Sequence, residues 1–444
     1  MCEVKNKGFN YFLKFILIYI GILLFFVLFM VLGCLFPSKL IDKNVRESSK
    51  ILIDEGLDHD YDTFFFARVD NYTDVLMINE AYSVDNTNPL YSALSVRKNY
   101  KNGVTRYQDS DITGELEAVG QDTYRPDLEL ESFLNGKIDT SINYARYWHG
   151  YLPVLRLLLI FFNVSEIRML FFFIFSILFI WLFILLLRKF NLRIAFIYVF
   201  SLFVVGYFAI PKSLQNIPIF LVMMFSCITL LMRFEKIKSF SLYIFIVGCI
   251  ANFIDSLTVP LITLAMPLYI YLLKYDCINW KDKLKLVFKY AILWFVGYVG
   301  VWLSKWIIFD LLYNQGLIES AITQVLYRSV HPNSFGYSPE NNVILLLIVY
   351  FLSYGFEYSL FLLVPYCIFI LLNINSVKFR FKGFKDYFKN CVPYLVICLF
   401  PIIWYLVLKN QTLSHDWFVC RHMLVFITGI LLCFTNIFVV RRRR

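Results

Sequence analysis

Continuous apolar runs, each long enough to cross a lipid bilayer as a helix, constrain this chain more than any other feature. A helix needs about 20 apolar residues to span the hydrocarbon core, where every backbone polar group must be bonded within the protein. The runs are continuous rather than alternating, which favours helices over the strands of a membrane barrel. They predict about ten transmembrane helices, near residues 11–36, 166–187, 194–210, 215–232, 239–254, 257–273, 287–308, 342–373, 391–409 and 423–440.

The composition of the 444 residues points to the same class. Hydrophobic residues make up 59% of the chain and charged residues 17%, whereas about 25% of the residues of soluble proteins are charged. So few charges cannot cover a soluble protein of this length, which excludes a cytosolic enzyme, a secreted disulfide-rich domain and a disordered chain. The net charge of +10 lies beside the apolar runs and shows no nucleic-acid-binding pattern. We therefore expect an all-α polytopic membrane protein.

The basic residues predict its orientation, because cytoplasmic loops carry an excess of Lys and Arg. The basic clusters fall on one side if both termini are cytoplasmic and ten helices are crossed, which suits a multi-pass protein of the cell (inner or plasma) membrane. The chain then divides into a cytoplasmic N-terminus with the first span (1–36), an acidic extracytoplasmic loop (37–150), a multi-span bundle (151–440) and a basic cytoplasmic tail (441–444).

Two apolar segments do not fit a single straight span. Residues 342–373 are too long for one, and the polar stretch 353–357 predicts either a bend or a position at the outer interface. Residues 151–163 are too short and contain Arg156, so we expect a re-entrant or interfacial helix on the outer face.

The first polar cluster, Asp70 to Asp74, precedes a helix-like run in the large loop. On a helix the two carboxylates share a face, and their repulsion raises the pKa of one unless a metal or an arginine lies between them. Oxygen-ligated Mg²⁺ or Mn²⁺ is therefore left open. The alternative is helix capping, with Asn71 as the N-cap and Asp74 completing the box. The spacing alone favours capping.

Three further clusters lie at the predicted outer face. Residues 145–151 contain Arg146 and His149, which suit a lipid phosphate, and tyrosine and tryptophan side chains, which suit an aromatic interfacial belt equally well. Asp255 lies between two closely spaced apolar runs, where a carboxylate is either functional or a helix cap. Residues 414–422 contain Arg421 and two histidines that are not at the i, i+4 metal spacing. We expect no histidine-ligated metal.

Several motifs of soluble nucleotide chemistry are absent from the sequence. It contains no Walker A motif, no glycine-rich dinucleotide loop after a strand, and no cytoplasmic segment large enough for a nucleotide-binding domain. ATP-driven transport and the use of nucleotide sugars inside the cell are therefore poorly supported.

Taken together, the polar motifs resemble those of the GT-C superfamily of membrane glycosyltransferases, which use polyprenyl-phosphate sugars. Bacterial surface-polysaccharide and O-antigen glucosyltransferases of this kind resemble the chain over most of its length. It is carried by the large loop directly after the first span, DNYTD at 70–74, RYWHGY at 146–151 before a short apolar helix, NFIDSLTVP at 252–260 and SHDWFVCR at 414–421. Leu157 stands where proline is expected and Cys420 where an aromatic residue is common, which leaves the subfamily and substrate open.

The resemblance implies one inverting displacement at the outer face, in which a loop carboxylate acts as the base. A base of this kind contributes about 10²–10⁴-fold. The matching base is Asp74 first and Asp70 second, and the lipid tail is expected beside residues 151–163. The remaining candidates are a phosphate clamp of Arg146, His149 and Arg421, a sugar or phosphate contact at His415, and supporting roles for Tyr147, Trp148 and Asp255, the last holding one of the arginines.

We therefore expect an enzyme that moves a sugar from a polyprenyl phosphate to a glycan or lipid-linked acceptor. A polysaccharide polymerase or ligase is the first alternative, although its large loop usually comes late in the chain. A lipid or polysaccharide transporter is the second, although charges in mid-span or paired broken helices would be expected there. A non-catalytic scaffold with the same fold is the third.

Overall fold

The computed structural model describes residues 2–60, 68–99, 125–138, 140–237, 239–275, 278–330, 377–379, 383–436 and 438–440. These residues are mostly helical, which agrees with the expected all-α class. Six helical segments among them are long and apolar enough to cross a membrane: Leu13–Cys34, Val164–Lys189, Ile217–Lys236, Trp280–Tyr313, Phe384–Val407 and Trp417–Phe434. The predicted span at 342–373 and the tail at 441–444 lie outside the described residues.

Three other predicted spans form shorter helices. These are α8 (Leu192–Val204), α10 (Phe240–Ile254) and α11 (Leu261–Lys274), which have 13 to 15 residues each. Helix α8 stops early because Gly206 adopts a left-handed conformation (φ 75°), and a 3₁₀ turn, η4 (Tyr207–Lys212), follows it. The predicted boundary at residue 210 is therefore wrong, since the apolar run there is longer than the helix.

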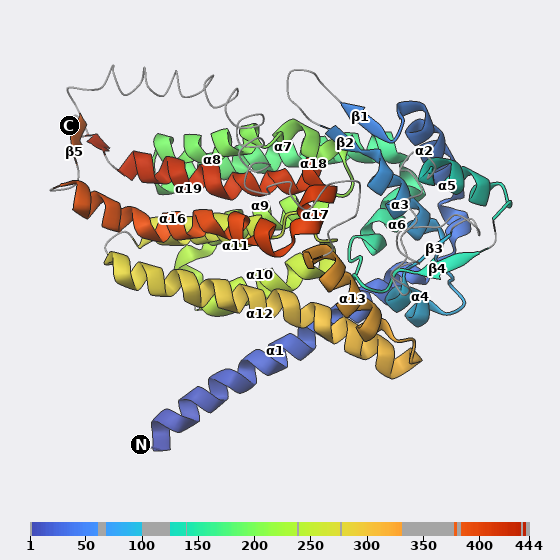
Figure 1. Ribbon diagram of the computed structural model, residues 1–444, viewed down its shortest axis with the longest axis horizontal. Coiled ribbons are helices and arrows are strands. Elements are labelled where there is room, and N and C mark those ends of the chain that lie inside the picture. Colours follow the sequence, from blue (N-terminus) through green and yellow to red (C-terminus); the bar gives the residue numbers. More distant parts are fainter. Residues whose placement is uncertain are drawn as a thin grey trace.

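The helices form a bundle whose members run side by side (Figure 1). Helix α10 packs against α12 at two glycines, because a Cβ atom at Gly248 would lie 2.3 Å from the Trp294 carbonyl oxygen and one at Gly297 would lie 2.5 Å from that of Phe245. The other long elements are α1 (Cys2–Cys34), α7 (Val164–Lys189), α9 (Ile217–Arg233) with η5 (Phe234–Lys236), α12 (Trp280–Tyr313), α16 (Phe384–Val407) and α19 (Met423–Asn436).

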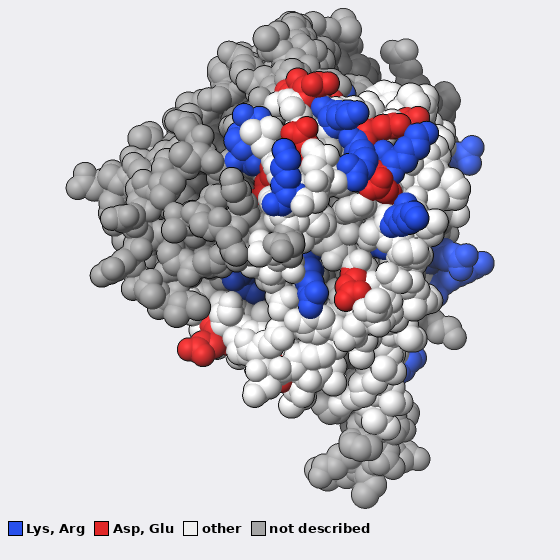
Figure 2. Space-filling model, turned by 90° about the vertical axis from the view of Figure 1, so that its right-hand side faces the viewer, with Lys and Arg blue, Asp and Glu red and all other residues white. Residues whose placement is uncertain are grey.

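One end of the bundle carries the described part of residues 37–150, which we call the head region (Figure 1). Its two pairs of short strands, β1 with β2 and β3 with β4, are both antiparallel. On the surface of this end, Lys and Arg alternate with Asp and Glu (Figure 2). Its elements are η1 (Ser38–Leu40), α2 (Asp42–Glu55), β1 (Asp58–Asp60), β2 (Arg68–Asp70), α3 (Asn71–Tyr82), α4 (Pro89–Ser95), β3 (Arg97–Asn99), α5 (Pro126–Leu134) and β4 (Ser141–Asn143).

A continuous cluster of buried apolar side chains joins the head region to the bundle. The short apolar helix expected at 151–163 is present as α6 (Leu152–Phe161). Its Arg156 is fully buried and donates hydrogen bonds to the carbonyls of Gly33, Phe36 and Ala81, at the ends of α1 and α3. This arginine therefore caps helix C-termini, which carry unpaired carbonyls.

The remaining elements lie in the C-terminal part. Helix α13 (Leu317–Val330) follows α12 after a turn in which Asn314 and Gly316 both have positive φ, and the Asp310 carboxylate accepts hydrogen bonds from the Leu317 and Ile318 amides. The others are β5 (Val377–Phe379), which pairs with β6 (Phe438–Val440), α17 (Lys409–Ser414), α18 (Asp416–Val419) and η9 (Cys420–His422).

Candidate functional site

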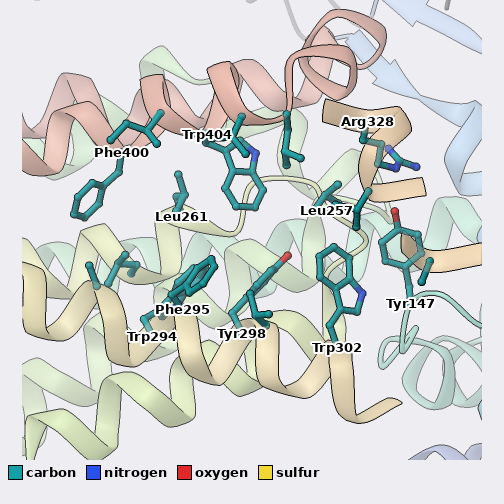
Figure 3. Close-up of a pocket in the computed structure, with 18 of the residues that line it drawn as sticks. Tyr147, Leu257, Leu261, Trp294, Phe295, Tyr298, Trp302, Arg328, Phe400 and Trp404 are labelled. Carbon is teal, nitrogen blue, oxygen red and sulfur yellow. The ribbon is translucent and has the colours of Figure 1, made fainter. Parts of the chain in front are cut away.

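A cavity of about 440 Å³ lies between α11, α12, α13 and α16 (Figure 3). Its walls are almost entirely apolar and include Leu261, Phe295, Trp302, Phe400 and Trp404. No residue of α6 lines it, so the cavity does not lie beside residues 151–163, where the lipid tail was expected.

Two arginines line this cavity, Arg146 from the segment before α6 and Arg328 from α13. In Figure 3, Arg328 and Tyr147 lie at one end of the cavity, and Phe295 and Phe400 lie toward the other. The Arg146 side chain donates to the Ser320 hydroxyl (3.4 Å) and lies 5.6 Å from the Tyr144 ring centre. Neither guanidinium forms an ion pair with a carboxylate among the described residues. The cavity is thus apolar along its walls and positively charged at one end, which we call the arginine end.

Helix α12 fixes the position of the segment that bears Arg146. The Trp306 indole donates to the Arg146 carbonyl (3.0 Å), and the Lys305 ammonium donates to the Tyr147 carbonyl. In the opposite direction, the Trp148 indole donates to the Val301 carbonyl (2.9 Å). Tyr147 and Trp148 are buried, so both take supporting positions next to Arg146.

His149 belongs to the same segment as Arg146, but its contacts do not support a role in a phosphate clamp. It is buried with φ 55°, its Nδ1 is 2.8 Å from the Tyr151 hydroxyl and 3.2 Å from Glu80, and its Nε2 is 3.1 Å from the Tyr144 carbonyl. Burial alone would raise the pKa of Glu80, but the charge and hydrogen bond of His149, the Tyr151 hydroxyl and the charge of Lys98 together hold it below its usual value. Both imidazole nitrogens are therefore already engaged within the protein.

The structure corrects the assignment of the cap of α3. The cap is Asp70 rather than Asn71, because the Asp70 carboxylate accepts from the Thr73 amide (2.9 Å) and the Thr73 hydroxyl (2.6 Å). Asp70 also accepts from the Trp417 indole (3.1 Å), across a separation of 347 residues. The first and last of the sequence motifs are thereby brought together.

Asp74, one turn further along α3, is fully buried in a different setting. Its carboxylate accepts from the Arg168 guanidinium of α7 (2.9 Å), and the Ser213 hydroxyl lies at 3.3 Å. Burial raises the pKa of Asp74 to about 6, which Arg168 opposes only in part and the charge of Asp70 reinforces. The same Arg168 also pairs with Glu55 (2.8 Å), so Asp74 belongs to an ion-pair network between head region and bundle.

The segment after α16 lies against α13, the helix that bears Arg328, because the Asn410 side chain donates to the Tyr327 carbonyl (3.0 Å). Burial and the positive charge of Arg328 lower the pKa of His415 to about 3, so its imidazole is neutral at physiological pH. The His415 ring lies 5.5 Å from that of Trp417, the partner of Asp70. Arg421 is buried, and its guanidinium donates to the Trp417 carbonyl (3.1 Å), which does not place it with Arg146.

Asp255 is buried at the end of α10, and within the part of the chain that the structure describes no arginine is paired with it. Its carboxylate accepts from the Thr258 amide (3.0 Å), the Thr258 hydroxyl and the Tyr298 hydroxyl (3.2 Å). Tyr298 lines the cavity, so Asp255 orients one wall residue.

Four charged residues of this region were missed in the sequence: Glu80, Arg168, Lys305 and Arg328. Charged residues within apolar helices would have indicated Arg168 and Lys305, and the amphipathic pattern of 317–330 would have indicated an interfacial helix carrying Arg328. Within the described ranges, no group of three or more His, Cys, Asp or Glu side chains is placed to hold a metal ion, and Mg²⁺ or Mn²⁺ at Asp70 and Asp74 stays a prediction. No family model, curated protein or solved structure matches the chain.

Proposed function

We propose that this protein is an integral-membrane glycosyltransferase that takes a sugar from a polyprenyl phosphate and transfers it to a glycan or a lipid-linked acceptor. The observation that carries the proposal is the apolar cavity with two arginines at one end. A ligand that fits it has a long apolar chain and an anionic head group. Guanidinium groups are well suited to phosphate oxygens, because they donate in a fixed fork.

The proposal includes a membrane topology. Ten spans with both termini in the cytoplasm place the head region and the arginine end of the cavity at the outer face. Helices α8, α10 and α11 count as spans in this topology, although they are shorter than 18 residues. A short helix crosses where the bilayer is locally thinned or where neighbouring protein covers its ends.

We assign the base to Asp70 rather than to Asp74. Asp74 is held by Arg168, and its contacts join the head region to α7. Asp70 contacts Trp417, whose ring lies 5.5 Å from that of His415, and the charge of Arg328 acts on His415. In the transfer, the acceptor oxygen bonds to the sugar C1 and the bond from C1 to the phosphate oxygen breaks. The phosphate keeps the electron pair, and the acceptor proton passes to Asp70.

A lipid transporter is the second candidate, because the same cavity could hold a lipid in transit. The position of the charges favours the enzyme. Arg328 and Tyr147 lie at the end of the cavity near the head region (Figure 3), and Arg146 adjoins Tyr147 in the chain and donates to Ser320 of α13. A transport path would be expected to carry charges at mid-depth.

The test is sugar transfer by the purified protein in detergent, with polyprenyl-phosphate hexoses as donors and cell-envelope extract as the source of acceptors. The wild type is compared with Asp70→Asn, Asp74→Asn and the exposed α2 variant Asp54→Asn as the matched control. We expect Asp70→Asn to lower turnover about 10²–10⁴-fold while it still binds lipid phosphate, and the control to match the wild type. If no donor is consumed and Asp70→Asn behaves like the wild type, the enzyme is rejected in favour of transport.

A further inference from the structure

The arginine end of the cavity carries more positive charge than the sugar donor can neutralise. Arg146 and Arg328 are permanently charged, and neither has a carboxylate partner among the described residues. A lipid phosphate that bears a sugar is a phosphodiester and has one negative charge. One positive charge therefore stays uncompensated while the donor is bound.

The titratable groups around the two arginines do not change this balance. Tyr144 is affected by the charges of Arg146, Arg328 and Glu80, and burial raises its pKa to about 12, so it stays neutral. His415 is neutral as well. Glu80 bonds to Tyr151 and His149 and is offset by the charge of Lys98, whose ammonium lies 4.7 Å from the Tyr144 ring centre. The two arginines that line the arginine end thus give it a charge of about +2, to which the Lys305 ammonium bonded to the Tyr147 carbonyl adds, in surroundings of low dielectric that weaken screening.

Transfer changes the charge of the ligand by one unit. When the bond from C1 to the phosphate oxygen breaks, the lipid phosphate becomes a monoester, whose second ionisation has a pKa near 6. We propose that the Arg146–Arg328 pair is matched to this dianion, so that the site binds the released lipid phosphate more tightly than the donor and turnover is limited by product release. The inference rests on the proposed function. Charge builds up on the phosphate already in the transition state, and interactions that are stronger there than in the bound donor accelerate the step.

The experiment measures binding of three small probes to the wild-type protein in detergent: farnesyl phosphate, farnesyl methyl phosphate and farnesol. Quenching of tryptophan fluorescence reports occupancy, because Trp302 and Trp404 line the cavity. At pH 8 we expect the monoester to bind at least about tenfold more tightly than the diester, and the diester more tightly than the alcohol. At pH 5, where the monoester loses its second charge, we expect the preference over the diester to fall below about threefold.

Substitutions then assign the preference to the arginines. Arg146→Gln and Arg328→Gln are each expected to reduce the ratio of monoester to diester affinity at least about threefold. Lys43→Gln, at a lysine side chain of α2 that is 85% exposed, is the matched control and should keep the wild-type ratio. Equal binding of the two esters at pH 8, or a preference that survives in both arginine variants, would overturn the inference. The wild-type comparison between pH 5 and pH 8 decides the matter even if an arginine variant does not fold.

The outcomes separate this inference from the proposed function. If both esters bind equally and far more tightly than farnesol, the lipid-phosphate site stands and the match to a dianion is wrong. If farnesol binds as tightly as both esters, the arginine end recognises no phosphate and both proposals fail.

Discussion

The two ends of helix α3 hold buried carboxylates in contrasting environments. Asp74, near its start, has a pKa raised to about 6, whereas the pKa of Glu80, near its end, lies below the usual value. Both side chains are almost completely buried, so burial alone does not explain the difference. Asp74 shares Arg168 with Glu55, while Glu80 has hydrogen-bonding partners in His149 and Tyr151 and the nearby charge of Lys98. The pKa of a buried acid thus depends on the charges around it as well as on burial, because the charge of Asp70 raises the pKa of Asp74 whereas the charges of His149 and Lys98 lower that of Glu80.

The two ends also differ in what they connect. Asp74 links the head region to α7, and Asp70 beside it reaches Trp417. Glu80 supports the segment that places Arg146 at the cavity. The start of α3 therefore connects the head region to α7 and to the segment of Trp417, and its end supports the segment that bears Arg146.

Removing the Glu80 contacts with His149 and Tyr151 should have the largest effect on stability. Glu80→Ala removes the carboxylate that pairs with the buried His149, and breaking a buried pair typically costs about 3–5 kcal/mol. We expect a loss of that size in the free energy of unfolding, measured by denaturant titration in detergent. Glu131→Ala, at an exposed position of α5, should stay within about 0.5 kcal/mol of the wild type. Similar losses for the two variants would show that the Glu80 network does not stabilise the fold.

The raised pKa of Asp74 should give the free energy of unfolding a pH dependence of intermediate size. Because the pKa of Asp74 is raised in the folded state, folding favours its protonated form, and this contribution is lost as the pH rises from about 4 to above 6. Between pH 5 and pH 7 the expected loss is about 1 kcal/mol. Glu80 titrates below this window, because its pKa is lowered from an ordinary value of 4.5.

Asp74→Asn removes the titrating group, so the difference between its pH dependence and that of the wild type isolates Asp74. We expect the variant to lose about 1 kcal/mol less than the wild type between pH 5 and pH 7. Asp54→Asn, on the exposed face of α2, should keep the wild-type slope. If the slopes of all three proteins coincide, the contrast between the two ends of α3 is wrong.

The smallest effect is expected at the contact between Asp70 and Trp417. Trp417→Phe removes one indole donor, but Thr73 still donates two hydrogen bonds to Asp70. We expect a loss of about 0.5 kcal/mol, at the low end for a single hydrogen bond. Trp181→Phe, on the exposed face of α7, is the matched control. A loss above 2 kcal/mol would mean that Trp417, rather than Thr73, holds Asp70 in place.

The apolar pattern predicted the class of fold better than the lengths of its helices. Runs of similar hydropathy became a helix of 26 residues in α7 and one of 13 in α8. Their termination depends on local features, such as the left-handed Gly206, that hydropathy does not record. The short helix at 151–163 was predicted because its length and its arginine are both unusual for a span.

The candidate site was predicted in part. The sequence indicated Asp70 and Arg146 as members of polar motifs but could not show that Trp417 reaches Asp70 or that Arg328 lies at the same cavity as Arg146. His149 was predicted as a clamp residue, but residue type and spacing do not reveal that both of its ring nitrogens are bonded within the protein. Long-range contacts decide which polar residues face a ligand and which support the others.

The hydrogen bonds from α12 to the segment that bears Arg146 have a mechanical consequence. With 34 residues, α12 is about 51 Å long, whereas the hydrocarbon core of a bilayer is about 30 Å thick. A helix that exceeds the bilayer accommodates the difference by tilting, and the tilt varies with bilayer thickness. Because Lys305 and Trp306 hold the carbonyls of residues 146 and 147, a change in tilt moves Arg146 with the helix. The position of Arg146 is thereby coupled to the tilt of α12.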